Sequence, residues 1–228
     1  DKDGRVEAVL FHRPLDTFNA EHYLLSESGP KKLDLPTKSS LQGYVSGRLV
    51  VSLEDNWAAK GMREGDLVDF DLAAVKANPA SLTPTLLLRP TETQSVEQVA
   101  TTRNRLVVAL FDNVKGQVLS YRRAGDGWTS TKLDLPKDST ITVGSASDHD
   151  DGLVLNVTSY LTPSSQWLAD ASAGKAQQVR SLPPRFDASK FMVNQHWATS
   201  KDGTKVPYFV VHRKDMKLDG SNPTLLYA

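Results

Sequence analysis

"RLVVALFDN" occupies residues 105–113 and nearly repeats "RLVVSLEDN", which occupies residues 48–56. A third stretch of the same kind, "GLVLNVTSY", follows at residues 152–160. One short β-type segment precedes each stretch and two follow it, and Gly, Asp, Asn and Pro separate the segments. The segments that complete the three units are 40–46, 65–72 and 84–90, then 95–102, 116–123 and 128–136, then 140–147, 165–172 and 176–183. Four short strands repeated about every 40–50 residues are typical of β-propeller blades.

The repeated stretch is the most continuously apolar segment of its unit. Residues 49–51 and 106–111 lack the polar alternation of a strand that has one face in solvent. We therefore expect the second strand of each blade to be buried on both faces, between the neighbouring blades. A β-sandwich or a jelly roll also contains many short strands, but neither usually repeats a four-strand unit with a recurring sequence. The predicted fold class is all-β, a partial β-propeller.

The first residues fit the later part of such a unit, with β-type segments at 5–14, 21–28 and 31–36. Residues 1–185 are therefore expected to form about three and a half four-stranded blades. The stretches 56–66 and 71–82 each allow a helical turn, because Ala, Lys, Met and Glu favour helix. We expect both to be loop decorations.

The pattern changes at a Pro-rich joint, residues 183–189. Residues 191–215 predict two strands around "SKDGT", because Asp202-Gly203 is a strong hairpin-turn signal. "TLLYA" at 224–228 predicts the start of a third strand. Residues 186–228 are therefore expected to begin a new sheet.

Composition excludes several classes of protein. Lys+Arg and Asp+Glu both number 27, so the net charge is zero, which argues against a broad nucleic-acid-binding surface. No apolar run approaches the roughly 18 residues of a membrane span. The absence of cysteine excludes disulfides and thiolate metal sites, and it is compatible with a cytoplasmic or a periplasmic protein. No Met opens the chain and an apolar run ends it, so both ends are expected to lie inside a longer polypeptide.

The C-terminal segment resembles a known family. "ATSKDGTKVPYFVVHRKDMKLDGSNPTLLYA" at 198–228 closely resembles the entry into the catalytic domain of the prolyl oligopeptidase family of serine peptidases. The three full blades resemble the later blades of that family's propeller more loosely.

The resemblance implies a seven-bladed propeller paired with an α/β-hydrolase domain that begins at residues 186–228. In the family, the propeller covers the active site and admits only short peptides, which a Ser-Asp-His triad typically cleaves on the carboxyl side of proline. The family pattern places the oxyanion-hole tyrosine immediately after Ala228 and the triad later still. The resemblance therefore implies no catalytic residue within this chain, no cofactor, and as partners only short peptides and the rest of the same polypeptide.

The residues agree with that expectation. A hydrolase nucleophile needs the pentapeptide G-x-S-x-G, which holds the serine on a sharp strand-to-helix turn. The nearest match, "GYVSG" at 43–47, has its serine one place off.

Several other residues could suggest a metal or ligand site, and for each of them we favour a structural role. "SDHDD" at 147–151 gathers Asp148, His149, Asp150 and Asp151, but it lacks the spaced ligands of a calcium loop and is expected to be an acidic turn. The other histidines do not have zinc-site spacing, so no metal site is expected; they are His12, His22, His196 and His212. The tryptophans are expected to pack between blades rather than line a ligand groove; they are Trp57, Trp128, Trp167 and Trp197.

The sequon Asn156-Val157-Thr158 lies in a strand that we expect to be buried, which disfavours glycosylation. Arg122-Arg123 and His212-Arg213-Lys214 are small basic clusters, expected to be solvated or to form ion pairs between domains.

Three functions remain open. The first is a propeller-gated serine peptidase, which residues 198–228 favour. The second is a non-enzymatic propeller that acts as an interaction scaffold, which predicts a closed ring without a hydrolase domain. The third is an inactive peptidase homologue that keeps the two-domain shape.

Overall fold

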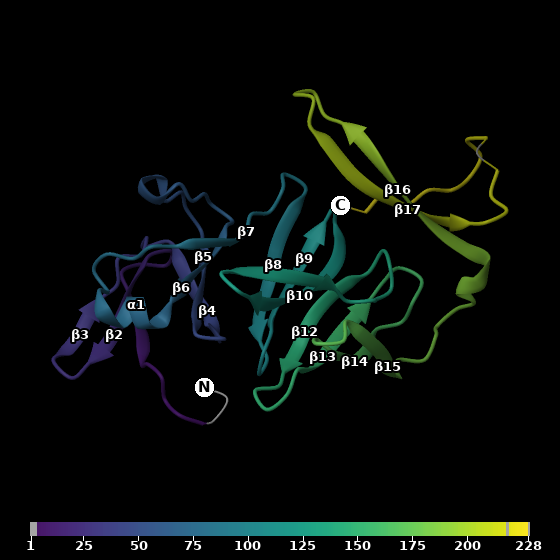
Figure 1. Ribbon diagram of the computed structural model, residues 1–228. Coiled ribbons are helices and arrows are strands. Elements are labelled where there is room, and N and C mark those ends of the chain that lie inside the picture. Colours follow the sequence, from purple (N-terminus) through teal and green to yellow (C-terminus); the bar gives the residue numbers. More distant parts are fainter. Residues whose placement is uncertain (1–3, 218, 228) are drawn as a thin grey trace.

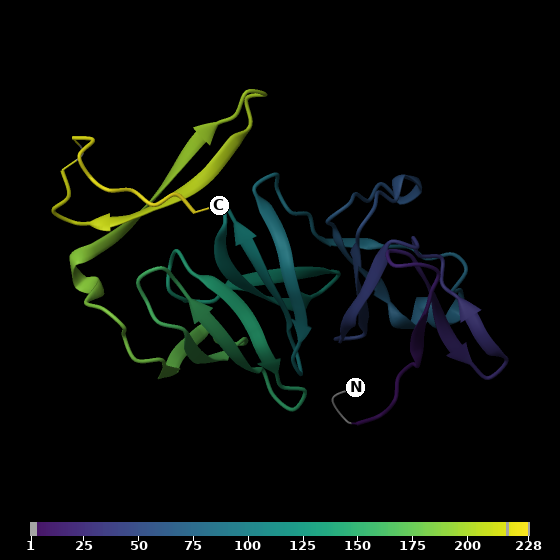
Figure 2. The same ribbon diagram turned by 180° about the vertical axis from the view of Figure 1, so that it is seen from behind.

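Four antiparallel sheets and a hairpin follow one another in the computed structural model, which describes residues 4–217 and 219–227. Figures 1 and 2 show the sheets standing side by side in chain order. The first sheet, called the partial blade, contains β1 (Leu10–Pro14), β2 (Ala20–Ser26) and β3 (Gly29–Lys32). The second blade contains β4 (Ser39–Val45), β5 (Arg48–Leu53), β6 (Leu67–Asp71) and β7 (Thr85–Leu88). The third contains β8 (Gln94–Thr101), β9 (Leu106–Asp112), β10 (Lys115–Ala124) and β11 (Gly127–Lys132). The fourth contains β12 (Thr140–Ala146), β13 (Gly152–Thr158), β14 (Ser165–Asp170) and β15 (Lys175–Ser181).

Each blade is a meander in which neighbouring strands pair in chain order. Among the first strands of the three full blades, β8 contacts both β4 and β12, so the same edge of each blade faces the centre of the partial ring. The expected three and a half blades are therefore confirmed. The repeated stretches occupy equivalent places, because each supplies the second strand of its blade: β5, β9 and β13.

The core lies between the blades, and β9 is its centre. Leu106 and Val108 pack towards the second blade, where they meet Val50 and Leu67. Val107 and Ala109, which point the opposite way, pack against the fourth blade. The sequence-based expectation of a strand buried on both faces is confirmed for β9. Each fully buried aliphatic side chain of this kind stabilises the fold by roughly 1.5–3 kcal/mol.

In β13 only one face is buried, which differs from the expectation. Leu153, Leu155 and Val157 face the third blade and are buried, while Asn156 on the other face is exposed. No further blade follows β15 among the described residues, so nothing packs on the second face. The prediction that Asn156 is buried is therefore wrong for the described residues.

Buried polar residues on β2, β6 and β10 each form a hydrogen bond to the following blade. His22 Nε2 donates to the carbonyl oxygen of Ser39 at 2.9 Å, and Ser120 Oγ donates to that of Ala171 at 2.6 Å. The Asp69 carboxylate accepts from Trp128 Nε1 at 2.7 Å and from the Arg48 guanidinium of its own blade. Asp69 is fully buried, so these donors satisfy a carboxylate that would otherwise be costly to bury. The tertiary contacts thus fix the register of one blade on the next.

Two short helical segments decorate the second blade, as expected: η1 (Ala58–Lys60) and α1 (Leu72–Ala77). Asp71 begins α1 by accepting the backbone N–H of Ala74 at 3.0 Å, which is a helix N-cap. Among the described residues, no helix is long and apolar enough to cross a membrane.

After β15 the chain passes through a linker that contains η2 (Ala188–Lys190) and forms a hairpin of β16 (Phe191–Thr199) and β17 (Lys205–Arg213). Gly203 has φ of 89°, which supports the turn predicted from Asp202-Gly203. The third strand predicted at 224–228 is not formed: residues 224–227 are irregular, and Ala228 lies outside the described residues. A strand needs a neighbour for its backbone groups, and no described strand pairs with this segment.

Trp128→Phe should lower the free energy of unfolding by about 1–3 kcal/mol, because it removes a donor from the buried Asp69 carboxylate. Trp167→Phe is the matched control, since Trp167 Nε1 donates at 3.0 Å to Ser165 Oγ of its own blade. Chemical denaturation of both variants measures the difference. Equal losses in the two variants would contradict a special role for the contact between blades.

His22→Gln should make the protein less sensitive to acid. Burial lowers the pKa of His22 from 6.5, and only the Ser39 carbonyl opposes that shift. Nδ1 of His22 has no hydrogen-bond partner in the described part of the chain. The unfolded chain therefore takes up the proton first, and stability that is present above pH 6.5 falls as the pH drops towards the lower folded pKa.

A glutamine at position 22 can still donate to Ser39 but does not titrate. The free energy of unfolding, measured at pH 8 and at pH 5.5, should fall less in the variant than in the wild type. The same fall in both proteins would show that His22 does not carry the effect.

Candidate functional site

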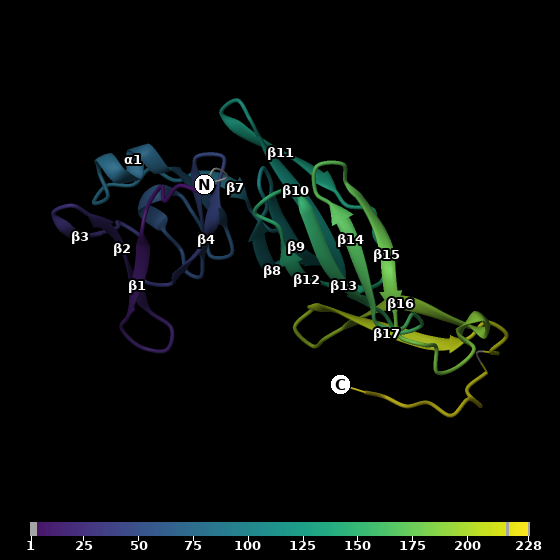
Figure 3. The same ribbon diagram turned by 90° about the horizontal axis from the view of Figure 1, so that it is seen from below.

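The strands run between two ends of the partial ring. The loops at 15–19, 54–66, 113–114 and 159–164 lie at one end, together with the β16–β17 hairpin, and we call it the hairpin end. Figure 3 shows the hairpin lying across the ends of the blade strands. The turns at 46–47, 102–105 and 147–151 lie at the opposite, distal end.

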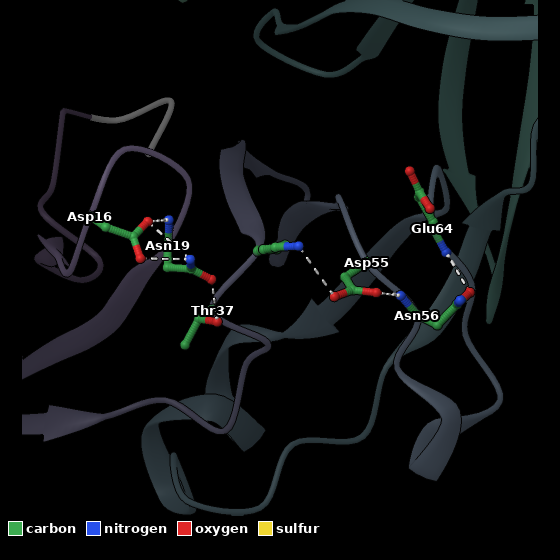
Figure 4. Close-up of polar contacts among 7 residues, drawn as sticks. Asp16, Asn19, Thr37, Asp55, Asn56 and Glu64 are labelled. Atoms are coloured by element: carbon green, nitrogen blue, oxygen red, sulfur yellow. Dashed lines mark hydrogen bonds and ion pairs between the residues drawn. The ribbon is translucent and has the colours of Figure 1, made fainter.

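Asp and Asn side chains organise the loops of the hairpin end in the partial and second blades (Figure 4). Asn19 donates to both carboxylate oxygens of Asp16 at 2.9 Å and accepts from Thr37 Oγ1 at 2.9 Å. The backbone N–H of Phe18 and the side chain of Asn19 lower the pKa of Asp16. The polar atoms of these side chains are used to hold loops, which favours a structural role.

The second blade repeats the arrangement with Asp55 and Asn56. Asp55 accepts the backbone N–H of Asn56 at 2.7 Å and pairs with Lys38 at 3.8 Å. Asn56 Oδ1 in turn accepts the backbone N–H of Glu64 at 3.1 Å, which ties down the long β5–β6 loop. Both groups of contacts are visible in Figure 4.

The third blade carries the same Asp-Asn pair at the end of the repeated stretch, and here it contacts the hairpin. Asp112 accepts from Gln94 Nε2 at 3.1 Å and from Asn113 Nδ2 at 3.0 Å. The carbonyl oxygen of Asn113 accepts from Gln195 Nε2 of β16 at 2.7 Å. Sequence reasoning missed this contact, although the shared Asp-Asn ending of residues 48–56 and 105–113 was a usable signal.

The strands β4, β8 and β12 line the centre of the partial ring, and we call this surface the channel wall. Each has one β-bulge against the second strand of its blade, at Gln42, Glu97 and Gly144. A bulge re-aims the local side chain, and Glu97 is exposed although β8 is flanked by both neighbours. Glu97 is the only acidic or basic residue of these three strands, and Ser95 Oγ donates to it at 2.8 Å.

The remaining polar groups of this wall are hydroxyls and amides, which bind a peptide backbone but do not activate a nucleophile on their own. Ser40 donates to Glu54 at 2.6 Å, and Gln42 donates to Ser52 at 2.8 Å. The expectation that the catalytic residues follow Ala228 stays a prediction.

The predicted acidic turn "SDHDD" joins β12 to β13 at the distal end. The Asp151 carboxylate accepts from Thr102 Oγ1 at 2.7 Å and from the backbone N–H of Asn104 at 2.8 Å, both in the third blade. Arg103 donates to the carbonyl oxygen of His149 at 3.0 Å. The turn therefore joins two blades.

Beside it lies a pocket of about 410 Å³, whose lining includes Glu7, Tyr44, Arg103 and Asp148. In the described residues, no group of three or more His, Cys, Asp or Glu side chains is placed to hold a metal ion.

The other histidines do not converge. His12 pairs across the ladder with the buried His22, His196 stacks on Tyr208, and His212 Nε2 lies 2.8 Å from Asn194 Oδ1. "GYVSG" forms the end of β4 and its distal turn, where Ser46 has φ of 51°.

The tryptophans divide by role. Trp128 joins two blades, as expected, and Arg123 lies over its ring at 5.8 Å. Trp57 packs on Phe70 of its own blade, and Trp167 packs against the core between the third and fourth blades. Trp197 on the hairpin is exposed, so the packing expected for it is not found among the described residues.

The buried Asp66 and the partly exposed Arg89 form an ion pair that the sequence analysis did not single out. Burial raises the pKa of Asp66, but two donors outweigh it, and the net pKa is lowered. Those donors are the Arg89 guanidinium, at 2.6 and 2.8 Å, and the backbone N–H of Arg63, at 2.8 Å. The pair closes the β5–β6 loop onto β7.

Comparison with known proteins agrees with this architecture. Residues 17–181 match the family model "Prolyl oligopeptidase, N-terminal beta-propeller domain". The whole chain is 43% identical to an uncharacterized peptidase of Sinorhizobium fredii (strain NBRC 101917 / NGR234), of which it covers 32%. It is also 31% identical to the dual function macrocyclase-peptidase POPB of Amanita bisporigera. That match includes 99% of this chain and 27% of the relative. The chain thus spans about a third of the length of these curated relatives.

Among solved structures, the chain is similar in fold to a post-proline cleaving enzyme from Rickettsia typhi. The TM-score is 0.77 at 24% identity, over 95% of this chain and 32% of that one. Oligopeptidase B from Trypanosoma brucei gives a TM-score of 0.71 at 17% identity, over 95% of this chain and 33% of that one. The chain belongs to the prolyl oligopeptidase family of peptidases, and its blades form part of that family's N-terminal β-propeller.

Proposed function

We propose that the whole protein is a serine peptidase that cleaves short peptides, typically on the carboxyl side of proline, and that the propeller gates access to its active site. Residues 186–228 begin the α/β-hydrolase domain in this proposal, and the serine, aspartate, histidine and oxyanion tyrosine follow Ala228. One observation carries the proposal. After the fourth blade the chain leaves the blade pattern and forms a hairpin that docks across one end of the propeller.

The described residues serve this function by shaping the approach to the active site. The channel wall carries hydroxyl and amide groups at Ser95 and Gln42, which hydrogen-bond to peptide backbones of any sequence. The folded blades are held together by contacts on both faces of β9, so the wall is stiff rather than adaptable. Such a wall favours short, extended peptides over folded proteins, which cannot enter a side-chain-lined channel.

The chemistry in this proposal is acyl transfer. A histidine accepts the proton of the serine hydroxyl as the oxygen attacks the peptide carbonyl, and oxyanion donors stabilise the negative charge that develops. Support for proline comes from the relatives' names, which include a prolyl endopeptidase of Elizabethkingia meningoseptica, 29% identical over 49% of this chain. The Glu97 carboxylate in the channel wall would favour peptides with a positively charged group over those with an acidic one.

A fluorophosphonate probe and a peptide series test the proposal on the full-length protein. The probe should label one serine located beyond Ala228, and labelling should abolish cleavage of a short proline-containing peptide. Mass spectrometry should place the cut after the proline. A folded protein substrate should resist cleavage, while the same substrate after denaturation and digestion to short peptides should be cleaved.

The outcomes separate the alternatives. Labelling of a serine within residues 1–228 would contradict the assignment of the catalytic groups. Absence of both labelling and cleavage would favour an inactive homologue or an interaction scaffold. Cleavage after residues other than proline would keep the peptidase and overturn the specificity.

A further inference from the structure

The hairpin contacts two different blades through two side chains that lie opposite each other in its ladder. Gln195 of β16 and Phe209 of β17 are directly opposite in the antiparallel ladder, so their side chains project from the same face. Gln195 Nε2 donates to the carbonyl oxygen of Asn113 in the third blade at 2.7 Å. Phe209 packs on Tyr160 in the fourth blade, with ring centroids 5.3 Å apart. The hairpin therefore straddles the boundary between the third and fourth blades.

The turn that presents the Asn113 carbonyl is held in a conformation that Val114 does not favour. Asn113 and Val114 have φ of 49° and 66°, and they form the two-residue turn between β9 and β10. Such turns prefer Asn-Gly, because a β-branched residue rarely adopts positive φ. Contacts to Asp112 hold Asn113, and its backbone N–H donates to the carbonyl oxygen of Thr93 at 2.9 Å. Strain retained at an exposed turn points to a role for the position of that turn.

The linker before the hairpin is tied to both of its neighbours. On the propeller side, the backbone N–H of Leu182 donates to the carbonyl oxygen of Ser164 at 3.0 Å. On the hairpin side, Phe186 packs edge-on against Phe191, with centroids 5.6 Å apart. Between them lies a pocket of about 330 Å³ whose lining includes Tyr160, Leu182 and Phe186. The Gln195 and Phe209 contacts attach the hairpin to the blades at two points beyond those of the linker.

We propose that Gln195 and Phe209 are positioning residues that form a two-point anchor, which seats the hairpin across the third and fourth blades. The anchor sets the orientation, relative to the hairpin end, of the polypeptide that follows the linker. One consequence of this inference rests on the proposed function. A catalytic portion held in place by the anchor excludes long peptides, and a catalytic portion released from the anchor admits them.

The double variant Gln195→Ala/Phe209→Ala in the full-length protein tests the anchor. The matched control is His196→Ala/Tyr208→Ala, which removes the neighbouring stacked cross-strand pair on the opposite face of the same hairpin. Loss of a hydrogen bond to a carbonyl and of an aromatic contact is together worth about tenfold in the equilibrium between seated and released states. Limited proteolysis within residues 183–190 should therefore be about tenfold faster in the anchor variant than in the control.

A second readout is kcat/KM for a short peptide and for a long peptide with the same cleavage site. The kcat/KM for the long peptide, divided by that for the short peptide, should rise in the anchor variant and stay unchanged in the control. Fluorophosphonate labelling should persist in both. Equal proteolysis in the anchor variant and the control would overturn the anchor. Faster proteolysis without labelling of the wild type would keep the anchor and reject the serine peptidase.

Two single variants cover the case in which the double variant does not fold. Gln195→Glu keeps the side-chain size but cannot donate to the Asn113 carbonyl, so linker proteolysis should accelerate. Val114→Gly relieves the positive φ while keeping the carbonyl in place, so linker proteolysis should not accelerate. The reverse pattern in these two variants would contradict the proposal.

Discussion

Burial of one strand on both faces is the constraint on which the remaining structure depends. The side chains of β9 alternate between the second and the fourth blades, and both sets are removed from water. Because both faces must be apolar, the strand cannot show polar alternation, and the same sequence recurs wherever a blade has neighbours on both sides. The burial also fixes the distance between blades, which lets single polar residues such as Asp69 and Ser120 reach across to the next blade with short hydrogen bonds.

Because the blades are held in register, their loops meet at two defined ends. At the hairpin end, the Asp55-Asn56 pair of the second blade closes the β5–β6 loop. The equivalent Asp112-Asn113 pair of the third blade presents a carbonyl oxygen to the hairpin. At the distal end, Asp151 joins the third and fourth blades. The ring thus positions a docking surface for the polypeptide beyond the linker, while the inner strands supply a polar wall to the channel. In the proposed peptidase, these two features would decide how the catalytic portion is placed and which peptides reach it.

Much of this fold follows from sequence periodicity, whereas contacts between distant loops do not. The repeat at 48–56 and 105–113 predicted four-stranded blades and a doubly buried second strand, because those features depend on the local apolar pattern. The Asp202-Gly203 turn was also predictable, because tight hairpin turns favour residues that adopt positive φ. The exposure of Asn156 was not, because burial of its face depends on what packs beyond β13. The strand predicted at 224–228 is not formed in its described residues, because a strand needs a paired neighbour and no described strand lies beside this segment. The Gln195–Asn113 contact joins residues far apart in sequence and required coordinates to be found.

Hydrogen exchange on the full-length protein tests the central claim most directly. If β5 and β9 are buried on both faces by neighbouring blades, the amides of residues 49–51 and 106–110 should be among the slowest to exchange. The amides of the outer strands β7 and β11, at the blade edge away from the ring centre, should exchange much faster. Exchange in β5 and β9 as fast as in β7 and β11 would contradict the account.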